Sequence, residues 1–225
     1  MKRSMFVAGM CLAAVLMFGS AAQAALIKVG TATYEGTDYN LIYDDAQNLV
    51  WLDYKAPSTV DFKSGHNTWV AGLGSALQVN LDSPWTSDID WTAGWRLPSA
   101  GASPAIGFNQ TTSEMGYLYY VLLGKEAEQD PLGCVSPFEN LQEGTYWAAE
   151  TASWGRSWAF TFGSNGPQLA HPDYPGDKSG LQFSPSNGDP NVTAIAVIEG
   201  SVVPEPATLS LLALGGLALS RRRRK

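Results

Sequence analysis

Few side chains in this sequence could act as a nucleophile or as a general base near neutral pH. The only histidines are His66 and His171, and the only cysteines are Cys11 and Cys134. A zinc site of His and Cys would need nearly all of them from distant positions, and no G-x-S-x-G sequence supplies a serine nucleophile. Carboxylates are abundant, so composition leaves glycoside hydrolysis open. We expect a protein that is not an enzyme.

Tryptophan offers the strongest candidate binding chemistry. The chain has eight tryptophans, and an indole ring can either fill a core or stack on the face of a sugar. Three of them lie beside turn-forming residues and are the ligand-binding candidates: Trp85, Trp91 and Trp154. Others fall within apolar runs and are expected to be core residues: Trp51, Trp95, Trp147 and Trp158.

An acidic stretch at 171–191 offers oxygen ligands. It is rich in Pro, Gly and Asp and is longer than structural connections normally are. The candidate metal ligands are Asp173, Asp177 and Asp189, and hard cations such as calcium prefer such oxygens. Their spacing matches no EF-hand, and a solvated loop is the alternative. We expect no cofactor, with calcium as the one ion that this loop could suit.

The elements that would position these residues follow from apolar periodicity. Alternation of apolar residues predicts strands, and the first three form a β-meander with a turn at 44–48. The expected strands are 27–34, 39–43, 49–52, 145–149, 157–162 and 192–198. Residues 80–92 and 99–110 are polar and rich in turn formers, so we expect loops there.

Two helices are expected. Apolar residues recur at helical spacing from Phe62 to Leu73, with Asp61 as N-cap, and His66 on that face is expected to pack rather than to bind a metal. Thr111 and Glu114 match a capping box and predict a second helix that ends near residue 124. We expect Glu114 to act as a cap and not as a site residue.

The chain carries signals for export. Residues 1–24 have a basic start (Lys2, Arg3), an apolar stretch and the A-x-A sequence Ala22-Gln23-Ala24, so we expect cleavage by signal peptidase. Cys11 would be removed with this segment. Cys134 would then be the only cysteine, so an intramolecular disulfide is excluded and the exported domain must be stable through its core.

The tail at 203–225 combines an extended segment, an apolar run and a basic cluster. The prolines of Pro204-Glu205-Pro206 favour extended backbone. The apolar run that follows is about 21 Å long as a helix, shorter than the bilayer core of about 30 Å. The cluster after it should stay on the cytoplasmic side: Arg221, Arg222, Arg223, Arg224 and Lys225.

These three parts in this order resemble the PEP-CTERM sorting signal. The resemblance implies recognition by a membrane enzyme of the exosortase class and a temporary transmembrane anchor. It also implies a Gram-negative host that makes exopolysaccharide, with the cell surface or the extracellular matrix of a biofilm as destination. An ordinary C-terminal helix packed on the domain is the alternative.

The region 32–200 resembles the Lcl C-terminal-like domain of unknown function. The motifs that carry the likeness are Trp95-Arg96-Leu97-Pro98, Glu114 and Tyr146-Trp147. The resemblance implies a C-type-lectin-like α+β fold with antiparallel strands, two helices and long loops. The motifs through which calcium-dependent lectins hold sugar are missing from the sequence. We expect Arg96 to stack on a ring while it bonds a carboxylate or carbonyl at the centre of the domain.

Charge excludes one class of partner. The signal segment at 1–24 and the cluster at 221–225 hold seven of the 14 basic residues, whereas all 21 acidic residues lie at 25–206, so this region carries a net charge near −14. Nucleic acid is therefore not an expected partner. We expect a non-catalytic protein of the envelope or exopolysaccharide matrix that binds glycans. The alternatives are a structural or protein-interaction module and a glycoside hydrolase.

Overall fold

The structure is a computed structural model that describes residues 25–56, 62–128, 132–133, 135–163 and 179–205. Within these residues, no helix is long and apolar enough to cross a membrane. The expected signal peptide, Cys134, and the expected apolar anchor of the tail lie outside the described residues.

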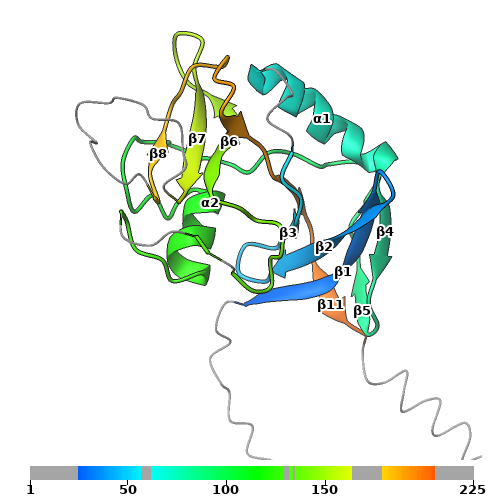
Figure 1. The fold of residues 1–225 in the computed structure, drawn as a ribbon. Coiled ribbons are helices and arrows are strands. Elements are labelled where there is room, and N and C mark those ends of the chain that lie inside the picture. Colours follow the sequence, from blue (N-terminus) through cyan, green and yellow to red (C-terminus); the bar gives the residue numbers. More distant parts are fainter. Residues whose placement is uncertain (1–24, 57–61, 129–131, 134, 164–178, 206–225) are drawn as a thin grey trace, which may run out of the picture.

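A five-stranded antiparallel sheet forms around the first three strands of the chain (Figure 1). It contains β1 (Leu26–Tyr34), β2 (Thr37–Asp44), β3 (Leu49–Leu52), β4 (Gln78–Leu81) and β10 (Ala196–Glu199), in the order β10-β3-β2-β1-β4. The expected β-meander is confirmed. Its second turn forms because the Asp44 carboxylate accepts the backbone N–H groups of Ala46 and Gln47, each at 3.1 Å.

A second sheet has four strands in the order β8-β7-β6-β9. They are β6 (Gly144–Thr151), β7 (Ser157–Phe162), β8 (Gln182–Phe183) and β9 (Val192–Thr193). The β6–β7 hairpin confirms the expected strands, but β8 lies in the stretch that we expected to be a loop. Its two buried residues pair with β7, and a strand of this length is too short to show any periodicity in the sequence.

The segment 192–199 contributes to both sheets, which corrects the expectation of a single strand. β9 runs parallel to β6, whereas β10 runs antiparallel to β3 in the other sheet. Every residue from β9 through position 198 is buried. Apart from Thr193 the sequence at 192–198 is apolar throughout, so it gives no sign of the point at which the chain changes sheet.

The first helix, α1 (Phe62–Ala76), has the expected position. Its buried face includes Val70 and Leu73, and His66 is only 1% exposed. The expected N-cap, Asp61, lies outside the described residues.

The second helix begins with α2 (Glu114–Tyr117) and continues as a π-helix, η1 (Leu118–Leu122). The expected capping box is wrong, because the N-cap is Ser113, whose hydroxyl accepts the N–H of Gly116 at 3.1 Å. The carboxylate of Glu114 instead accepts bonds from the Arg96 guanidinium and from the N–H of Ser99. The end of the helix near residue 124 agrees with the expectation.

The expected loop at 80–92 is also wrong in part. β4 occupies its start, and β5 (Trp85–Ser87) pairs with β11 (Val202–Pro204) in a small two-stranded sheet. β4 and β5 lie at sheet edges, and the residues of these two strands are half-buried or exposed. Polar side chains are common at such positions, so the sequence looks like a loop.

Two apolar clusters fill the molecule, and residues of β3 alternate between them. Val50 and Leu52 join the cluster that includes α1, whereas Leu49 and Trp51 join the cluster that includes α2 and η1. This alternation follows from the two-residue period of a strand. The expected core tryptophans are confirmed, since Trp51, Trp95 and Trp147 are buried and Trp158 is partly buried. The fold is mixed α+β with mostly antiparallel strands.

A buried carboxylate ties a connecting segment to the sheet. Asp53, directly after β3, is 0% exposed. It accepts the N–H of Glu139 at 2.7 Å and that of Asn140 at 3.0 Å. Burial raises the pKa of the Asp53 carboxyl and these donors lower it, with burial the larger effect. The carboxylate thus fixes the start of the segment that leads into β6.

Replacing Asp53 with alanine should lower the free energy of unfolding by about 2–4 kcal/mol, because buried N–H donors would lose their acceptor. Urea unfolding of the exported domain measures this. Glu139→Ala is the matched control, because its backbone N–H remains and its side chain is exposed. A similar loss in both variants would contradict the role given to Asp53.

Candidate functional site

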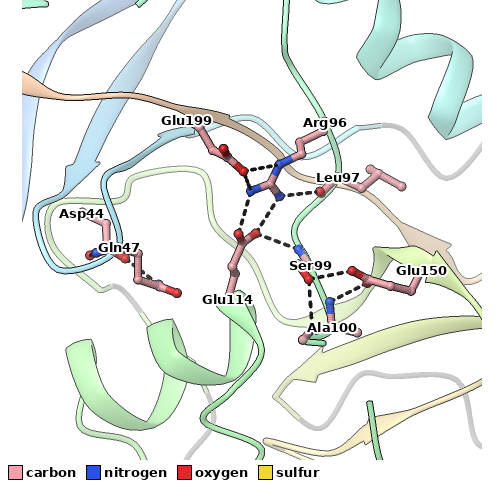
Figure 2. Close-up of polar contacts among 10 residues, drawn as sticks. Asp44, Gln47, Arg96, Leu97, Ser99, Ala100, Glu114, Glu150 and Glu199 are labelled. Atoms are coloured by element: carbon pink, nitrogen blue, oxygen red, sulfur yellow. Dashed lines mark hydrogen bonds and ion pairs between the residues drawn. The ribbon is translucent and has the colours of Figure 1, made fainter. Parts of the chain in front are cut away.

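The arginine of the Trp-Arg-Leu-Pro motif is held between two carboxylates (Figure 2). Arg96 Nη1 and Nη2 donate to the two oxygens of Glu114 at 2.8 and 2.7 Å, and Nη2 also donates to Glu199 Oε1 at 2.6 Å. Burial lowers the pKa of the guanidinium, but the bonds and charges of both glutamates outweigh it and raise the pKa above its ordinary value. Arg96 is therefore a permanent cation within the framework.

The residues after Arg96 donate three hydrogen bonds to the carboxylates of Glu114 and Glu150, which Figure 2 also shows. Glu114 Oε2 accepts the N–H of Ser99 at 2.7 Å. Glu150, at the end of β6, accepts the Ser99 hydroxyl and the Ala100 N–H, each at 2.6 Å. Charge-assisted bonds of this kind are about twice as strong as neutral ones. The segment is thus fixed to α2 and to the second sheet.

Backbone contacts complete this junction. Arg96 and Val197 of β10 exchange two N–H···O bonds at 2.9 Å, and the carbonyl of Pro98 accepts the N–H of Ala149 at 2.8 Å. The other residues of this motif and those of the Tyr146-Trp147 motif are buried: Trp95, Leu97, Pro98, Tyr146 and Trp147. The motif residues therefore come together as a structural junction between the two sheets, and the carboxylate contacts expected for Arg96 are present.

An open hollow of about 360 Å³ lies beside this junction. Its lining combines apolar and charged groups: Ile89, Asp90, Ala93, Gly94, Arg96, Ile198 and Glu199. The guanidinium is already engaged by its two glutamates, so it has little capacity left for an anionic ligand. The hollow is a surface feature of the framework.

The three tryptophans expected to bind ligand differ in exposure. Trp85 and Trp91 are half-buried and pack against the core, and the ring of Trp91 lies 6.2 Å from that of Trp95. Trp154 is 95% exposed. The structure therefore leaves one of the three with a fully available ring.

Trp154 sits at the tip of the β6–β7 hairpin, and its backbone is fixed there. Trp154 and Gly155 both have positive φ, 62° and 68°, as at the two central positions of a type I′ turn. The Gly155 carbonyl accepts the N–H of Asn187 at 3.1 Å, and Arg156 Nη1 donates to the Ser184 carbonyl at 3.0 Å. The exposed ring thus projects from an anchored turn.

The expected calcium ligands cannot be assessed as a set, because Asp173 and Asp177 lie outside the described residues. Asp189 is described, and its carboxylate accepts the backbone N–H of Asn191 at 3.0 Å. Within the described part of the chain, no group of three or more His, Cys, Asp or Glu side chains could hold a metal ion.

The start of the sorting signal is part of the domain. Val203 and Pro204 belong to β11, and the N–H of Glu205 donates to the Pro84 carbonyl at 2.6 Å. Pro206 and the cluster Arg221, Arg222, Arg223 and Arg224 lie outside the described residues.

Sequence reasoning missed Lys63, a buried lysine on α1. It is 3% exposed, and its Nζ donates to the carbonyls of Ala149 and Glu150 at 2.7 and 2.9 Å. Burial lowers the pKa of Lys63 to about 8, against a smaller opposing effect of the Glu150 charge. Its position on the helix face shared with His66 was the only available signal.

Comparison with family models shows that the PEP-CTERM protein-sorting motif matches residues 202–225. The motif implies an exported protein that an exosortase processes at the membrane, with the cell surface as its destination. Comparison with curated proteins and with solved structures found no match. The resemblance to the Lcl C-terminal-like domain therefore stays a prediction.

The two glutamates on Arg96 should contribute unequally to stability. Glu114→Gln should cost about 2–3 kcal/mol of unfolding free energy, because this side chain is 15% exposed and also accepts the Ser99 N–H. Glu199→Gln should cost at most about 1 kcal/mol, because its side chain is 72% exposed. Chemical denaturation of the two isosteric variants measures the difference, and equal costs would contradict it.

Lys63 should make the domain more stable as the pH rises from 7.5 to 9.5. The pKa of Lys63 is about 8 in the folded state, below its ordinary value of 10.5, so in this range the unfolded chain binds more protons. Relative to Lys63→Gln, which does not titrate, the wild type should gain about 1–2 kcal/mol of unfolding free energy. A constant difference between the two proteins across this range would show that burial does not depress this pKa.

Proposed function

We propose that the chain is an exported, non-catalytic protein that binds glycans at the cell surface or in the exopolysaccharide matrix. One observation carries the proposal: Trp154 is 95% exposed on a turn that is anchored by hydrogen bonds. An exposed indole can stack on the apolar face of a sugar. Because the turn is already fixed, little conformational entropy would be lost when the ring binds.

The backbone at this position supports the proposal. A non-glycine residue with φ near 60° costs about 1–2 kcal/mol, and tryptophan is an unusual residue in a turn that favours Asn-Gly. The wild-type sequence places its most exposed tryptophan here. Strained positions of this kind concentrate at functional sites, so a binding role explains why a large ring occupies a position that the fold alone would give to a smaller residue.

The surroundings supply polar groups for sugar hydroxyls. Ser153 and Arg156 are exposed on either side of the turn. The C-type-lectin-like resemblance belongs to this proposal, and so does calcium, with Asp173, Asp177 and Asp189 as the ligands expected from the sequence. The alternatives remain a structural or protein-interaction module, in which the same ring would meet an apolar patch on a protein, and a glycoside hydrolase.

Trp154→Asn should separate binding from stability. We expect it to weaken binding of the host's exopolysaccharide by about ten-fold or more, because the stacking face is lost. The melting temperature should stay the same or rise, because asparagine adopts this φ more easily. Isothermal titration calorimetry and thermal unfolding measure the two effects.

Trp154→Tyr is the matched control, since it keeps an aromatic face at the same position. Wild-type affinity in the asparagine variant would contradict the proposal. Binding that disappears with a chelator would indicate a metal-assisted site. Release of new reducing ends from the polysaccharide during incubation with the wild-type protein would favour the hydrolase.

A further inference from the structure

The sorting motif begins inside the folded domain. The matched segment starts at Val202, which is 2% exposed and packs in the same apolar cluster as α1. From there the chain forms β11 against β5, and Figure 1 shows the two strands side by side at the edge of the molecule. The motif that the processing enzyme recognises is thus continuous with the core of the domain.

The register of this ribbon suits the motif's first proline. Val203 pairs with Thr86 and Pro204 with Trp85, and the next residue, Glu205, donates its N–H to the Pro84 carbonyl. Hydrogen-bonded pairs alternate along an antiparallel ladder, so the Pro204 pair is a non-hydrogen-bonded one. The ladder therefore needs no N–H from Pro204. The N–H of its partner Trp85 also points out of the ladder and donates to the backbone carbonyl of Asp82 at 2.8 Å.

Contacts at Gly200 and Ser201, between β10 and β11, also fix the direction of the chain. Gly200 follows β10 with φ +144°, and a side chain at this position would collide with Ile89. The next N–H, that of Ser201, donates to Asp88 Oδ1 at 3.2 Å. These contacts set the direction in which the motif leaves the domain, so the position of β11 does not depend on its own short ladder alone.

The ribbon fixes the backbone of the motif but leaves its side chains available. Val203, Pro204 and Glu205 are all exposed. β11 has β5 as its single partner among the described strands. Its outer edge lacks a donor at Pro204, which discourages pairing with unrelated strands. A partner must therefore recognise the side chains of Val203, Pro204 and Glu205. We expect the group on that partner that contacts the Glu205 carboxylate to be cationic.

We propose that β5 is a docking strand that presents the sorting motif, already extended, to the exosortase. In the sequence only Pro206 separates Glu205 from the apolar run that begins at Ala207. The ribbon would therefore lie at the membrane surface, where the enzyme works. Pairing with β5 removes the entropy that a free tail would lose on binding, so correct folding of the domain favours processing.

The test changes β5 and leaves the motif intact. Thr86→Pro removes a ladder N–H opposite Val203, whereas Thr86→Val keeps the backbone and removes only the hydroxyl that donates to the Val203 carbonyl at 3.3 Å. In the exosortase-producing host, we expect the proline variant to slow conversion of tailed precursor to processed protein by about ten-fold. The valine variant should stay within about two-fold of wild type, and Glu205→Ala gives the rate of failed recognition.

Unchanged processing of Thr86→Pro would overturn the proposal. If that variant loses the protease resistance of the wild-type domain, Gly-Ser-Gly-Ser inserted after Val202 replaces it, because the insertion frees the motif while every β5 residue stays. We expect the same ten-fold slowing from it, and wild-type processing of the insertion variant would equally overturn the proposal.

A disulfide across the ribbon distinguishes presentation from concealment. Val202 pairs with Ser87, and Cα atoms in a non-hydrogen-bonded pair lie about 4.5 Å apart, within disulfide range. The double variant Val202→Cys/Ser87→Cys should be processed as fast as either single variant, because the locked ribbon already has the presented form. Blocked processing that a reductant restores would show that β5 conceals the motif, and would overturn the proposal.

Discussion

The bidentate pair between Arg96 and Glu114 is the contact on which the arrangement of the two sheets depends. The backbone of Arg96 also pairs with β10, and Glu114 accepts the N–H of Ser99. The hydroxyl of Ser99 in turn donates to Glu150 of the second sheet. A guanidinium that is partly buried must have its donors satisfied. The same carboxylate that neutralises it therefore also sets the path of the chain between the sheets.

Buried charge is used throughout the molecule to hold irregular backbone. The Asp44 carboxylate accepts backbone N–H groups in the turn after β2, and the Asp53 carboxylate accepts those of the segment at 138–141. Lys63 donates to two carbonyls at the end of β6. Such groups satisfy backbone donors and acceptors that neither sheet can pair. These contacts hold connections between the strands in place.

The features with a proposed role in recognition lie at the periphery of this framework. Trp154 projects from a hairpin tip, and the sorting motif leaves along an edge ribbon. In each, the backbone is held by the domain while the side chains face outward. This arrangement suits an exported protein that makes its contacts through a few exposed groups held on a folded scaffold.

Local sequence determined much of this protein. The meander, α1, the β6–β7 hairpin and the core tryptophans follow from periodicities of two and about four residues, and the sorting motif is contiguous. The tertiary structure decided what depends on distant partners. Thr86 lies 117 residues from Val203, so no local pattern could reveal that β5 exists or that it holds the motif. The same holds for Glu114, whose capping-box spacing is local but whose carboxylate binds Arg96, 18 residues away. Charge-assisted bonds to a guanidinium are stronger than neutral ones, and the spacing of Thr111 and Glu114 carries no information about that distant partner.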